Sequence, residues 1–254
     1  MEIKLGLTII QKICAIFKSL FWKNKNVIYV NSNVKIFNIE ESKYLVKPSD
    51  VKIINCQSKK SSSLKDLKRH FLIMRINLFQ ILRNLRESSK ITYCGFCSTM
   101  FSIYDGYQIG NTTNFQLIDF NKNYYLINDN IEYSSKKMSL DDSKKEINIV
   151  ISSSYDISNL KIKDFPSYRF DIKEPNLLNG FYLSNIYFFV KSILDSCGDY
   201  NIKKVNLYVA AKQSVNFVVG LAIQNYHPQI YVYEYRENRF KYCMDLFNNK
   251  IIEE

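Results

Sequence analysis

The sequence is poor in glycine, with seven such residues among 254, at positions 6, 95, 106, 110, 180, 198 and 220. Neither a G-x-G-x-x-G fingerprint nor a Walker A loop can be written from these positions. This excludes the glycine-rich phosphate loops of dinucleotide-binding enzymes and of P-loop NTPases.

Histidine is rarer still, with only His70 and His227 in the chain. Neither has an evident nucleophile or carboxylate partner in the sequence, and no second C-x-x-C pair is present to complete a zinc site. The acidic pairs Asp141-Asp142 and Glu253-Glu254 fall in an expected loop and at the terminus, where carboxylates are ordinarily solvated. We therefore expect no catalytic residues, no metal and no cofactor, and a binding protein rather than an enzyme.

Targeting signals are also missing. The segment 5–22 is apolar, but Lys12 and Lys18 interrupt it and no small-residue cleavage site follows. It is also shorter than the roughly 20 uncharged residues that a membrane span needs. Six cysteines without a secretion signal are typical of free thiols in a reducing compartment, so we expect a cytoplasmic protein.

The residues that are present indicate a folded α/β protein with an uneven charge. Apolar residues make up 46% of the chain and charged residues 23%, which is typical of a globular protein with a sizeable core. The net charge is +11, of which residues 1–90 carry +12 and residues 91–254 carry −1. The basic excess therefore lies in the first third of the chain.

The segment 1–26 predicts an amphipathic helix with a narrow polar stripe. Its apolar residues include Leu5, Ile9, Ile10, Ile13, Phe17, Leu20 and Phe21. Such a helix can pack on its own domain, on a partner or on a membrane surface. Residues 27–30 and 34–39 then predict a short β-hairpin, with Asn31-Ser32-Asn33 as its turn.

The remaining chain shows the same order of elements twice. The first pass predicts a strand at 51–55, a helix at 63–87, a strand at 91–94, a helix at 98–109 and a strand at 115–119. The second predicts a strand at 147–152, a helix at 177–196, a strand at 205–209, a helix at 213–224 and a strand at 230–233. Each pass is β-α-β-α-β, which favours mostly parallel sheets with ligands outside the carboxyl ends of their strands.

A local alignment of the two passes supports a duplication. An offset of 114 pairs Ile103 with Phe217 and Gly106 with Gly220, and one inserted residue later Asp119 pairs with Glu234. A repeat longer than about 100 residues indicates duplicated halves rather than a solenoid, whose periods are shorter.

Three stretches resemble a known sensor family. Residues 205–220, VNLYVAAKQSVNFVVG, followed by YHPQIYVYEY at 226–235 and by Tyr242, resemble the closing strand-helix-strand of a SAVED domain. INIVISSSYDI at 147–157 resembles its middle strand, and the segment from Tyr93 to Gly106 resembles its first-half helix. The resemblance covers roughly residues 45–250.

The resemblance implies a fold and a function. The fold would be α/β, with two fused Rossmann-like (CARF-like) β-α-β-α-β halves related by pseudo-twofold duplication and preceded by the amphipathic helix. The corresponding division is 1–40 for helix and hairpin, 41–140 for the first CARF-like half and 141–254 for the second. SAVED domains bind cyclic oligonucleotides made by antiviral cyclases (CBASS) or by type III CRISPR complexes, and they usually control an attached effector.

Only the segment 1–40 precedes the first repeat here, so no attached effector is expected. We expect the effector to be a separate chain, or the N-terminal helix to provide the output, with homo-oligomerisation on ligand binding as one route. The expected ligand is a cyclic oligoadenylate or a related cyclic nucleotide.

The predicted site lies where two helices begin, because free N–H groups at helix N-termini suit the phosphates of such a ring. Lys212 would add a phosphate-pairing cation, and Phe96 could stack on a base. The alternative for Ser98 and Ser214 is that they cap their helices. The predicted ligand-binding residues are Phe96, Cys97, Ser98, Thr99, Ser153, Ser154, Tyr155, Ala211, Lys212, Gln213 and Ser214.

Two features have alternative interpretations. Cys94-Gly-Phe-Cys97 between a strand and a helix also resembles a thioredoxin redox motif, although the chain before it lacks that topology and positions 208–211 have no thiols. In the helix at 63–87, one face carries a basic stripe that is either solvated or a docking surface for an acidic partner, a membrane or a nucleic acid. The stripe comprises Lys65, Lys68, Arg69, Arg75, Arg83 and Arg86, and the opposite face, with Leu67, Phe71, Met74, Leu78 and Leu85, is expected to be core.

The sequence therefore predicts a sensor that binds a cyclic oligonucleotide between its two halves and relays the signal in antiviral defence. One alternative is an interaction protein that contacts a membrane or a partner through residues 1–26. Another is a ring nuclease that cleaves the bound messenger, since binding in a crevice can align a ribose hydroxyl for in-line attack.

Overall fold

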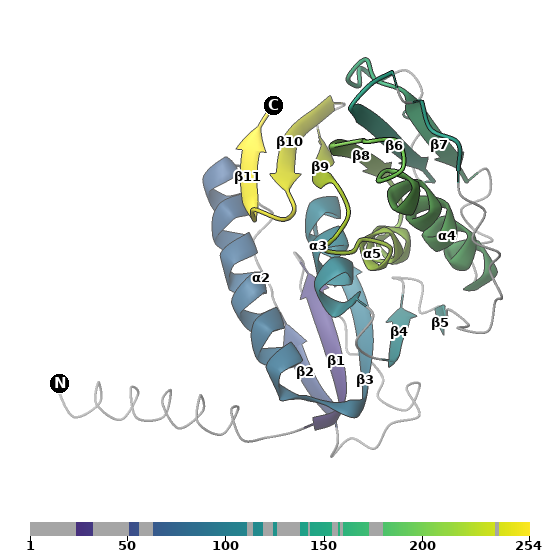
Figure 1. Ribbon diagram of the computed structural model, residues 1–254. Helices are drawn as coiled ribbons and strands as arrows, with labels where there is room; N and C mark the ends of the chain where they lie inside the picture. The colour runs from purple at the N-terminus through teal and green to yellow at the C-terminus, as the bar shows by residue number, and fades with distance from the viewer. Residues whose placement is uncertain are drawn as a thin grey trace.

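The protein is described here from a computed structural model, which describes residues 24–32, 51–55, 63–110, 114–118, 124–125, 138–141, 143–153, 157, 160–172, 180–236 and 239–254. These residues form a mixed α/β fold in three layers, with one layer of helices between two β-sheets (Figure 1). Residues 1–23 of the predicted N-terminal helix and the predicted strand 34–39 lie outside the described residues.

The first sheet has five strands in the order β2-β1-β3-β4-β5. Its strands are β1 (Asn24–Ser32), β2 (Val51–Asn55), β3 (Leu85–Phe96), β4 (Asn114–Ile118) and β5 (Tyr124–Tyr125). Strands β1 to β4 are parallel and β5 is antiparallel to β4. The carboxyl ends of the four parallel strands therefore lie along one edge of the sheet.

The second sheet has six strands in the order β11-β10-β9-β8-β6-β7. Its strands are β6 (Glu146–Ser152), β7 (Ser167–Asp171), β8 (Lys204–Ala210), β9 (Gln229–Arg236), β10 (Arg239–Asp245) and β11 (Lys250–Glu253). Strands β6 to β9 are parallel, and β10 and β11 continue the sheet as an antiparallel hairpin.

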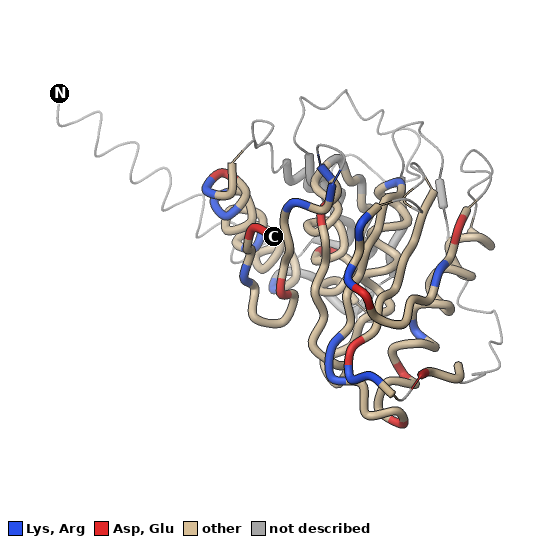
Figure 2. Tube along the Cα trace, turned by 90° about the horizontal axis from the view of Figure 1, so that it is seen from above, with Lys and Arg blue, Asp and Glu red and all other residues tan. Residues whose placement is uncertain are grey.

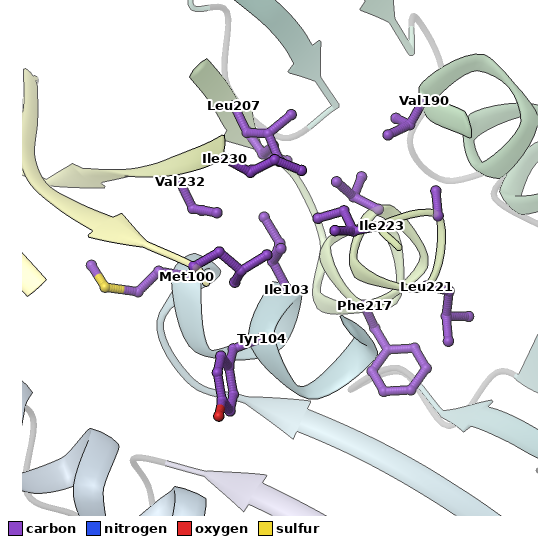
Figure 3. Packing of buried hydrophobic residues seen from close by; sticks show 14 of the residues in the cluster. Met100, Ile103, Tyr104, Val190, Leu207, Phe217, Leu221, Ile223, Ile230 and Val232 are labelled. Carbon is purple, nitrogen blue, oxygen red and sulfur yellow. The ribbon is translucent and has the colours of Figure 1, made fainter. Parts of the chain in front are cut away.

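The helices form the middle layer in the order α2, α3, α5 and α4 (Figure 1). Their bounds are α2 (Leu64–Asn84), α3 (Thr99–Ile109), α4 (Gly180–Ser196) and α5 (Gln213–Leu221). Figure 3 shows Ile103 of α3 directed toward Leu207 and Ile230 of the second sheet. On the other side of the layer, Phe217 of α5 stacks on Tyr93 of β3 with ring centroids 4.2 Å apart. The two sheets therefore share one core through α3 and α5.

Strand β8 is mostly apolar because both of its faces are covered, and its buried polar residue, Asn206, donates a hydrogen bond to the Asn148 Oδ1 of β6. Val205, Leu207 and Val209 belong to the core that includes the helices, whereas Tyr208 and Ala210 belong to a smaller cluster on the outer face. A strand buried on both sides reads as a continuous apolar run rather than an alternating one. This explains why residues 205–209 gave a clear strand prediction.

Helices α3 and α5 cross with their backbones in contact at two glycines. A Cβ added to Gly106 would collide with the carbonyl oxygen of Phe217 and lie 3.1 Å from the Cα of Gly220. A Cβ added to Gly220 would collide with the carbonyl oxygen of Ile103 and lie 2.8 Å from the backbone nitrogen of Tyr107. The offset of 114 that pairs Gly106 with Gly220 and Ile103 with Phe217 also relates these two contacts to each other.

The predicted hairpin near the N-terminus is wrong. Asn31 and Ser32, predicted in a turn, lie inside β1, and both neighbours of β1 are parallel strands, so no position beside it remains for an antiparallel arm. Residues 24–26, predicted as helix, also belong to this strand. Strand β1 comes from the predicted N-terminal segment 1–40, but it shares a sheet with β3, which belongs to the predicted first half 41–140.

Other element predictions differ mainly at their ends. Residues 85–87, predicted as the end of the long helix, begin β3, so Arg86 is not on the helix. The helices predicted at 98–109 and 213–224 occupy Thr99–Ile109 and Gln213–Leu221. Strands β5, β7, β10 and β11 were not predicted, because they are short or carry an irregular polar pattern.

Candidate functional site

Helices α3 and α5 begin at the carboxyl ends of β3 and β8. Cys97 and Ser98 separate β3 from α3, and Ala211 and Lys212 separate β8 from α5. Parallel strands followed directly by helices present helix N-termini, and the open edge beyond them, to a ligand. Since α3 and α5 also pack on each other, this edge is the candidate site.

Hydrogen bonds link the two helix ends. The Gln213 side-chain Nε2 donates to the Cys97 carbonyl oxygen at 2.7 Å, and the Ser102 Oγ donates to the Gln213 carbonyl oxygen at 3.2 Å. The Asn216 Nδ2 donates to the Thr99 Oγ1 at 3.5 Å. These bonds run in both directions between α3 and α5, so they fix where the N–H groups of each helix lie.

The segment that follows β6 joins the same edge. The Ser153 backbone N–H donates to the Ala210 carbonyl oxygen at 3.0 Å, and the Lys212 backbone N–H donates to the Ser153 Oγ at 3.4 Å. Ser154, Tyr155 and the side chain of Phe96 lie outside the described residues. The described part of the predicted site is therefore brought together by the carboxyl ends of three parallel strands, β3, β6 and β8.

Burial divides the predicted residues into two groups. The first group is buried and comprises Cys97, Ser98, Ser153 and Ser214. Of these, Cys97, Ser98 and Ser153 contact other residues of the protein through their side chains. The second group is half-buried and reaches the surface; it comprises Thr99, Ala211, Lys212 and Gln213. A ligand at this edge would contact the second group first.

The sequence prediction missed Glu234, which lies near the end of β9. Its Oε2 accepts hydrogen bonds from the Ser98 Oγ at 2.8 Å and from the Met100 backbone N–H at 3.2 Å. Its Oε1 lies 3.3 Å from the Arg236 Nε, and the residue is 5% exposed. A carboxylate of the second sheet therefore already occupies the N-terminus of α3, where negative charge is favoured.

One sequence signal could have indicated this role. The repeat alignment pairs Glu234 with Asp119, which places an acid after the core of the last parallel strand in each pass. Asp119 itself lies outside the described residues. The contact with Ser98 was not predictable from the repeat, because it connects residues 136 positions apart.

The capping alternative for the two serines is wrong. Ser98 occupies the N-cap position of α3, but its side chain makes no capping bond and instead donates to Glu234. The N-cap of α5 is Lys212, and Ser214 lies inside the helix. The two helix ends therefore differ in charge, with a bound carboxylate at α3 and a lysine at α5.

Cys97 contributes a buried thiol to the contact between the helices. Its Sγ lies 3.9 Å from the Tyr93 hydroxyl and 4.0 Å from the Gln213 Oε1. The side chain of Cys94 lies outside the described residues, so the redox alternative for this pair stays untested.

A second polar cluster lies at the opposite ends of the strands, and it corrects the prediction that His227 has no carboxylate partner. The His227 Nε2 lies 2.9 Å from the Asp195 Oδ1, and its Nδ1 accepts a hydrogen bond from the Gln224 backbone N–H at 2.9 Å. Lys191 and Tyr226 also bond to Asp195. Both ring nitrogens of His227 are thus engaged, which is the arrangement of a structural histidine rather than of a general base.

The pKa values in this cluster follow from burial and hydrogen bonding. Burial lowers the pKa of His227 and outweighs the opposing effect of Asp195. Burial would raise the pKa of Asp195, but the hydrogen bonds from His227, Lys191 and Tyr226 outweigh it, so this pKa is lowered.

Two searches of the described residues were negative. None of the helices among them is both long and apolar enough to cross a membrane. Within the same part of the chain, no three His, Cys, Asp or Glu side chains are grouped to hold a metal ion.

Comparisons with solved structures show a shared fold. The chain is similar to the Acinetobacter baumannii Cap4 SAVED/CARF-domain containing receptor with the cyclic trinucleotide 2'3'3'-cAAA, with a TM-score of 0.57 and 13% sequence identity over 85% of this chain. It is also similar to the same receptor with 3'3'3'-cAAA, with a TM-score of 0.53 and 16% identity over 84% of this chain. The chain spans about half of these receptors, at 50% and 49% of their lengths.

A search of curated proteins found no significant match. The family comparison is decisive, because one family model matches residues 75–246, which is more than half of the chain. That model describes the SMODS-associated and fused to various effectors sensor domain, and the protein therefore belongs to the SAVED family.

Proposed function

We propose that this protein is a receptor for a cyclic oligonucleotide, bound at the adjoining N-termini of α3 and α5, and that it relays binding to an effector in antiviral signalling. The observation that carries the proposal is the bonding of the two helix ends to each other, above all from Gln213 to the Cys97 carbonyl oxygen. The similar Cap4 receptor is described with cyclic trinucleotides, which supports the ligand class.

The proposal includes two duplicated Rossmann-like halves. Supporting it, strands β2-β1-β3-β4 and strands β7-β6-β8-β9 have the same spatial order and the same parallel directions. The reciprocal contacts of Gly106 and Gly220 fit a pseudo-twofold axis between α3 and α5. A ring-shaped ligand on such an axis would meet equivalent elements from both halves.

The two helix ends would contribute unequally to phosphate binding. At α5, the helix N-terminus and the Lys212 ammonium group both favour an anion. At α3, Glu234 already compensates the helix N-terminus and bonds to the Met100 N–H. We therefore place the main phosphate contact at Lys212 and Gln213, with Thr99 contacting an uncharged part of the ligand.

Signal relay would follow from differential affinity. Ligand binding shifts a conformational equilibrium only if it favours one arrangement of the halves over another. The bonds between α3 and α5, and the bond from Ser98 to Glu234, join the halves at the site and are the contacts through which such a shift would act. The effector would be a separate chain, and assembly of several copies on ligand binding is one route to it.

Calorimetric titration of the full chain with cyclic di-, tri- and tetranucleotides tests the proposal. We expect at least one ring to bind, and Lys212→Ala to weaken it about 10- to 100-fold, since a hydrogen bond to a charged group contributes about 1.5–3 kcal/mol. The matched control is Lys203→Ala, because Lys203 is exposed just before β8, at the opposite end of that strand from Lys212.

Two results would overturn the proposal. One is the absence of binding to every ring tested. The other is an equal loss of affinity in Lys203→Ala and Lys212→Ala, which would indicate non-specific attraction to the net positive charge rather than a site at α5.

A further inference from the structure

Helix α2 exposes a row of apolar side chains on the face predicted to be a basic stripe. Leu72 is 56% exposed, Ile76 50% and Phe79 66%, and Ile73 beside them is 43% exposed. With 3.6 residues per helical turn, these four positions fall on the same third of the helix surface as Lys65 and Arg83. The stripe therefore has basic residues toward its two ends and a mostly apolar centre, along one side of which Arg75 lies over the Phe71 ring.

The described elements leave this apolar face uncovered. Helix α2 is the outermost helix of the middle layer (Figure 1), and its opposite face, with Leu67, Met74 and Leu78, packs in the core. Basic residues occur on its first turns and also on other elements, rather than in one patch (Figure 2). A row of four apolar side chains on adjacent turns, with charged residues beyond both ends, is typical of a surface that contacts another element or molecule.

The position of β1 indicates which segment can reach the face. Asn24, the first residue of β1, pairs with Leu85, which directly follows the last residue of α2. The chain before Asn24 therefore starts beside the carboxyl end of α2, within about two turns of Phe79.

The segment that begins there has the composition and length to cover the face. Residues 5–21 contain nine large apolar residues of the types Leu, Ile and Phe, and their polar positions fall in a narrow stripe. As a helix this segment would be about 26 Å long, compared with about 32 Å for the 21 residues of α2. It can therefore run back along α2 over the whole exposed row.

We infer that residues 5–21 dock as an amphipathic helix on the face of α2 formed by Leu72, Ile73, Ile76 and Phe79. Other occupants are a second copy of the chain or an anionic membrane. The tether at Asn24 favours the chain's own segment, because a short linker gives it an effective concentration of about millimolar. Lys12 and Lys18 lie on the polar stripe of the segment and would face solvent.

Hydrogen exchange of the full chain, measured by mass spectrometry at a concentration where the protein is monomeric, tests the inference. We expect amides of residues 5–21 to exchange at least 10-fold more slowly than in the free peptide of the same sequence. The double substitution Ile76→Asp with Phe79→Asp should bring the exchange to within about 3-fold of the free peptide. Both changed residues are exposed, so the rest of the fold should keep its protection.

The matched control is Phe181→Asp, because Phe181 is 64% exposed on α4, at the far side of the helical layer. This substitution should leave the exchange of residues 5–21 unchanged. A second test places the change in the segment, where Ile9→Asp with Ile13→Asp should remove the protection in the same way.

Three outcomes would overturn the inference. The first is free-peptide exchange of residues 5–21 in the unchanged monomer. The second is protection that rises with protein concentration, which would assign the face to a second copy. The third is protection that arises only with vesicles containing phosphatidylserine, which would assign it to a membrane.

Discussion

Gly106 and Gly220 determine how closely the two central helices approach. At each glycine the partner helix presents a backbone carbonyl oxygen, so an added methyl group would meet main chain and not a movable side chain. Both glycines have ordinary helical conformations, and their role is therefore steric. Their pairing in the repeat alignment follows from this shared requirement.

We predict that Gly220→Ala destabilises the protein by roughly 3 kcal/mol, at the upper end of the range for overpacking, because the helices must separate. Gly198→Ala is the matched control, since a Cβ at Gly198 has nothing within 4 Å. It should be neutral or stabilise by about 0.4–1 kcal/mol through the unfolded state. Urea unfolding of the three proteins measures both values, and equal stability of the two variants would contradict the steric role.

His227 predicts a pH dependence of stability. Its pKa in the folded protein is lower than the ordinary value of 6.5, so the unfolded chain takes up a proton first as the pH falls. The stabilisation is therefore present above about pH 6.5 and is lost as the pH falls below it. The lowered pKa of Asp195 adds a further loss only near and below its ordinary value of 3.8.

We expect the unfolding free energy of the unchanged protein to fall between pH 6.5 and pH 5, by at most about 1.4 kcal/mol per pH unit for one proton. His227→Gln should show a smaller slope in this interval. Urea unfolding at a series of pH values measures the slopes, and parallel curves for the two proteins would argue against the assignment.

At the scale of elements, α3 depends on a carboxylate from another sheet. Helix α3 has no acidic residue in its first turn and no side-chain cap of its own. Glu234 of β9 provides both functions by accepting from Ser98 and from the Met100 N–H. The start of α3 is therefore stable only when the second sheet is in place.

We predict that Glu234→Gln lowers the unfolding free energy by about 1–2 kcal/mol, because the neutral amide loses the favourable charge at the helix N-terminus and the pair with Arg236. Glu253→Gln is the control, since Glu253 is exposed in β11 and its loss should cost less than about 0.5 kcal/mol. Thermal unfolding followed by circular dichroism compares the two. A cost for Glu253→Gln as large as that for Glu234→Gln would mean that only the net charge matters.

At the scale of the whole molecule, both sheets contribute to one continuous core. Buried residues from α2, β3, α3, α5, β8 and β9 belong to the same cluster. Ile103 points toward the second sheet and Phe217 points to the opposite side of the middle layer (Figure 3), where it stacks on Tyr93 of the first sheet. The two sheets should therefore fold and unfold together.

We predict a single calorimetric unfolding transition for the full chain. Met74→Ala in α2 and Leu207→Ala in β8 should each cost about 2–5 kcal/mol and lower the midpoint of that same transition. Two resolved transitions, with each substitution shifting only one of them, would show that the two sheets unfold independently.

The sequence predicted the second half of the fold better than the first. Residues 147–152 and 205–209 form strands buried in the centre of a sheet, and their mostly apolar, β-branched character identifies them without knowledge of their partners, although Asn148 and Asn206 interrupt the runs. Residues 24–32 also contain an apolar run, but its partners β2 and β3 are parallel strands far along the chain. The local sequence pattern predicted a hairpin there, because such a pattern does not show with which distant strand a segment pairs.

The candidate site was predicted in part for the same reason. The repeat placed the segments 96–99 and 210–213 at equivalent points, and the structure brings their described residues together. The repeat could not show which of these residues are buried, nor that the Ser98 hydroxyl donates a hydrogen bond to Glu234. The sequence also places Leu72, Ile76 and Phe79 in the same helical stripe as the basic residues. The prediction counted only the charged residues of this stripe and overlooked these apolar ones, which the structure shows to be exposed.

The sequence by itself determined the alternation of strands and helices, the equivalent positions of Gly106 and Gly220 in the repeat alignment, and the absence of glycine-rich phosphate loops, because these depend on residue type and local spacing. Only the tertiary structure decided that β1 is an inner strand, that a carboxylate occupies the start of α3, and that α2 exposes an apolar face. Each of these depends on which distant segments lie in contact, and chain topology sets such contacts rather than local preference.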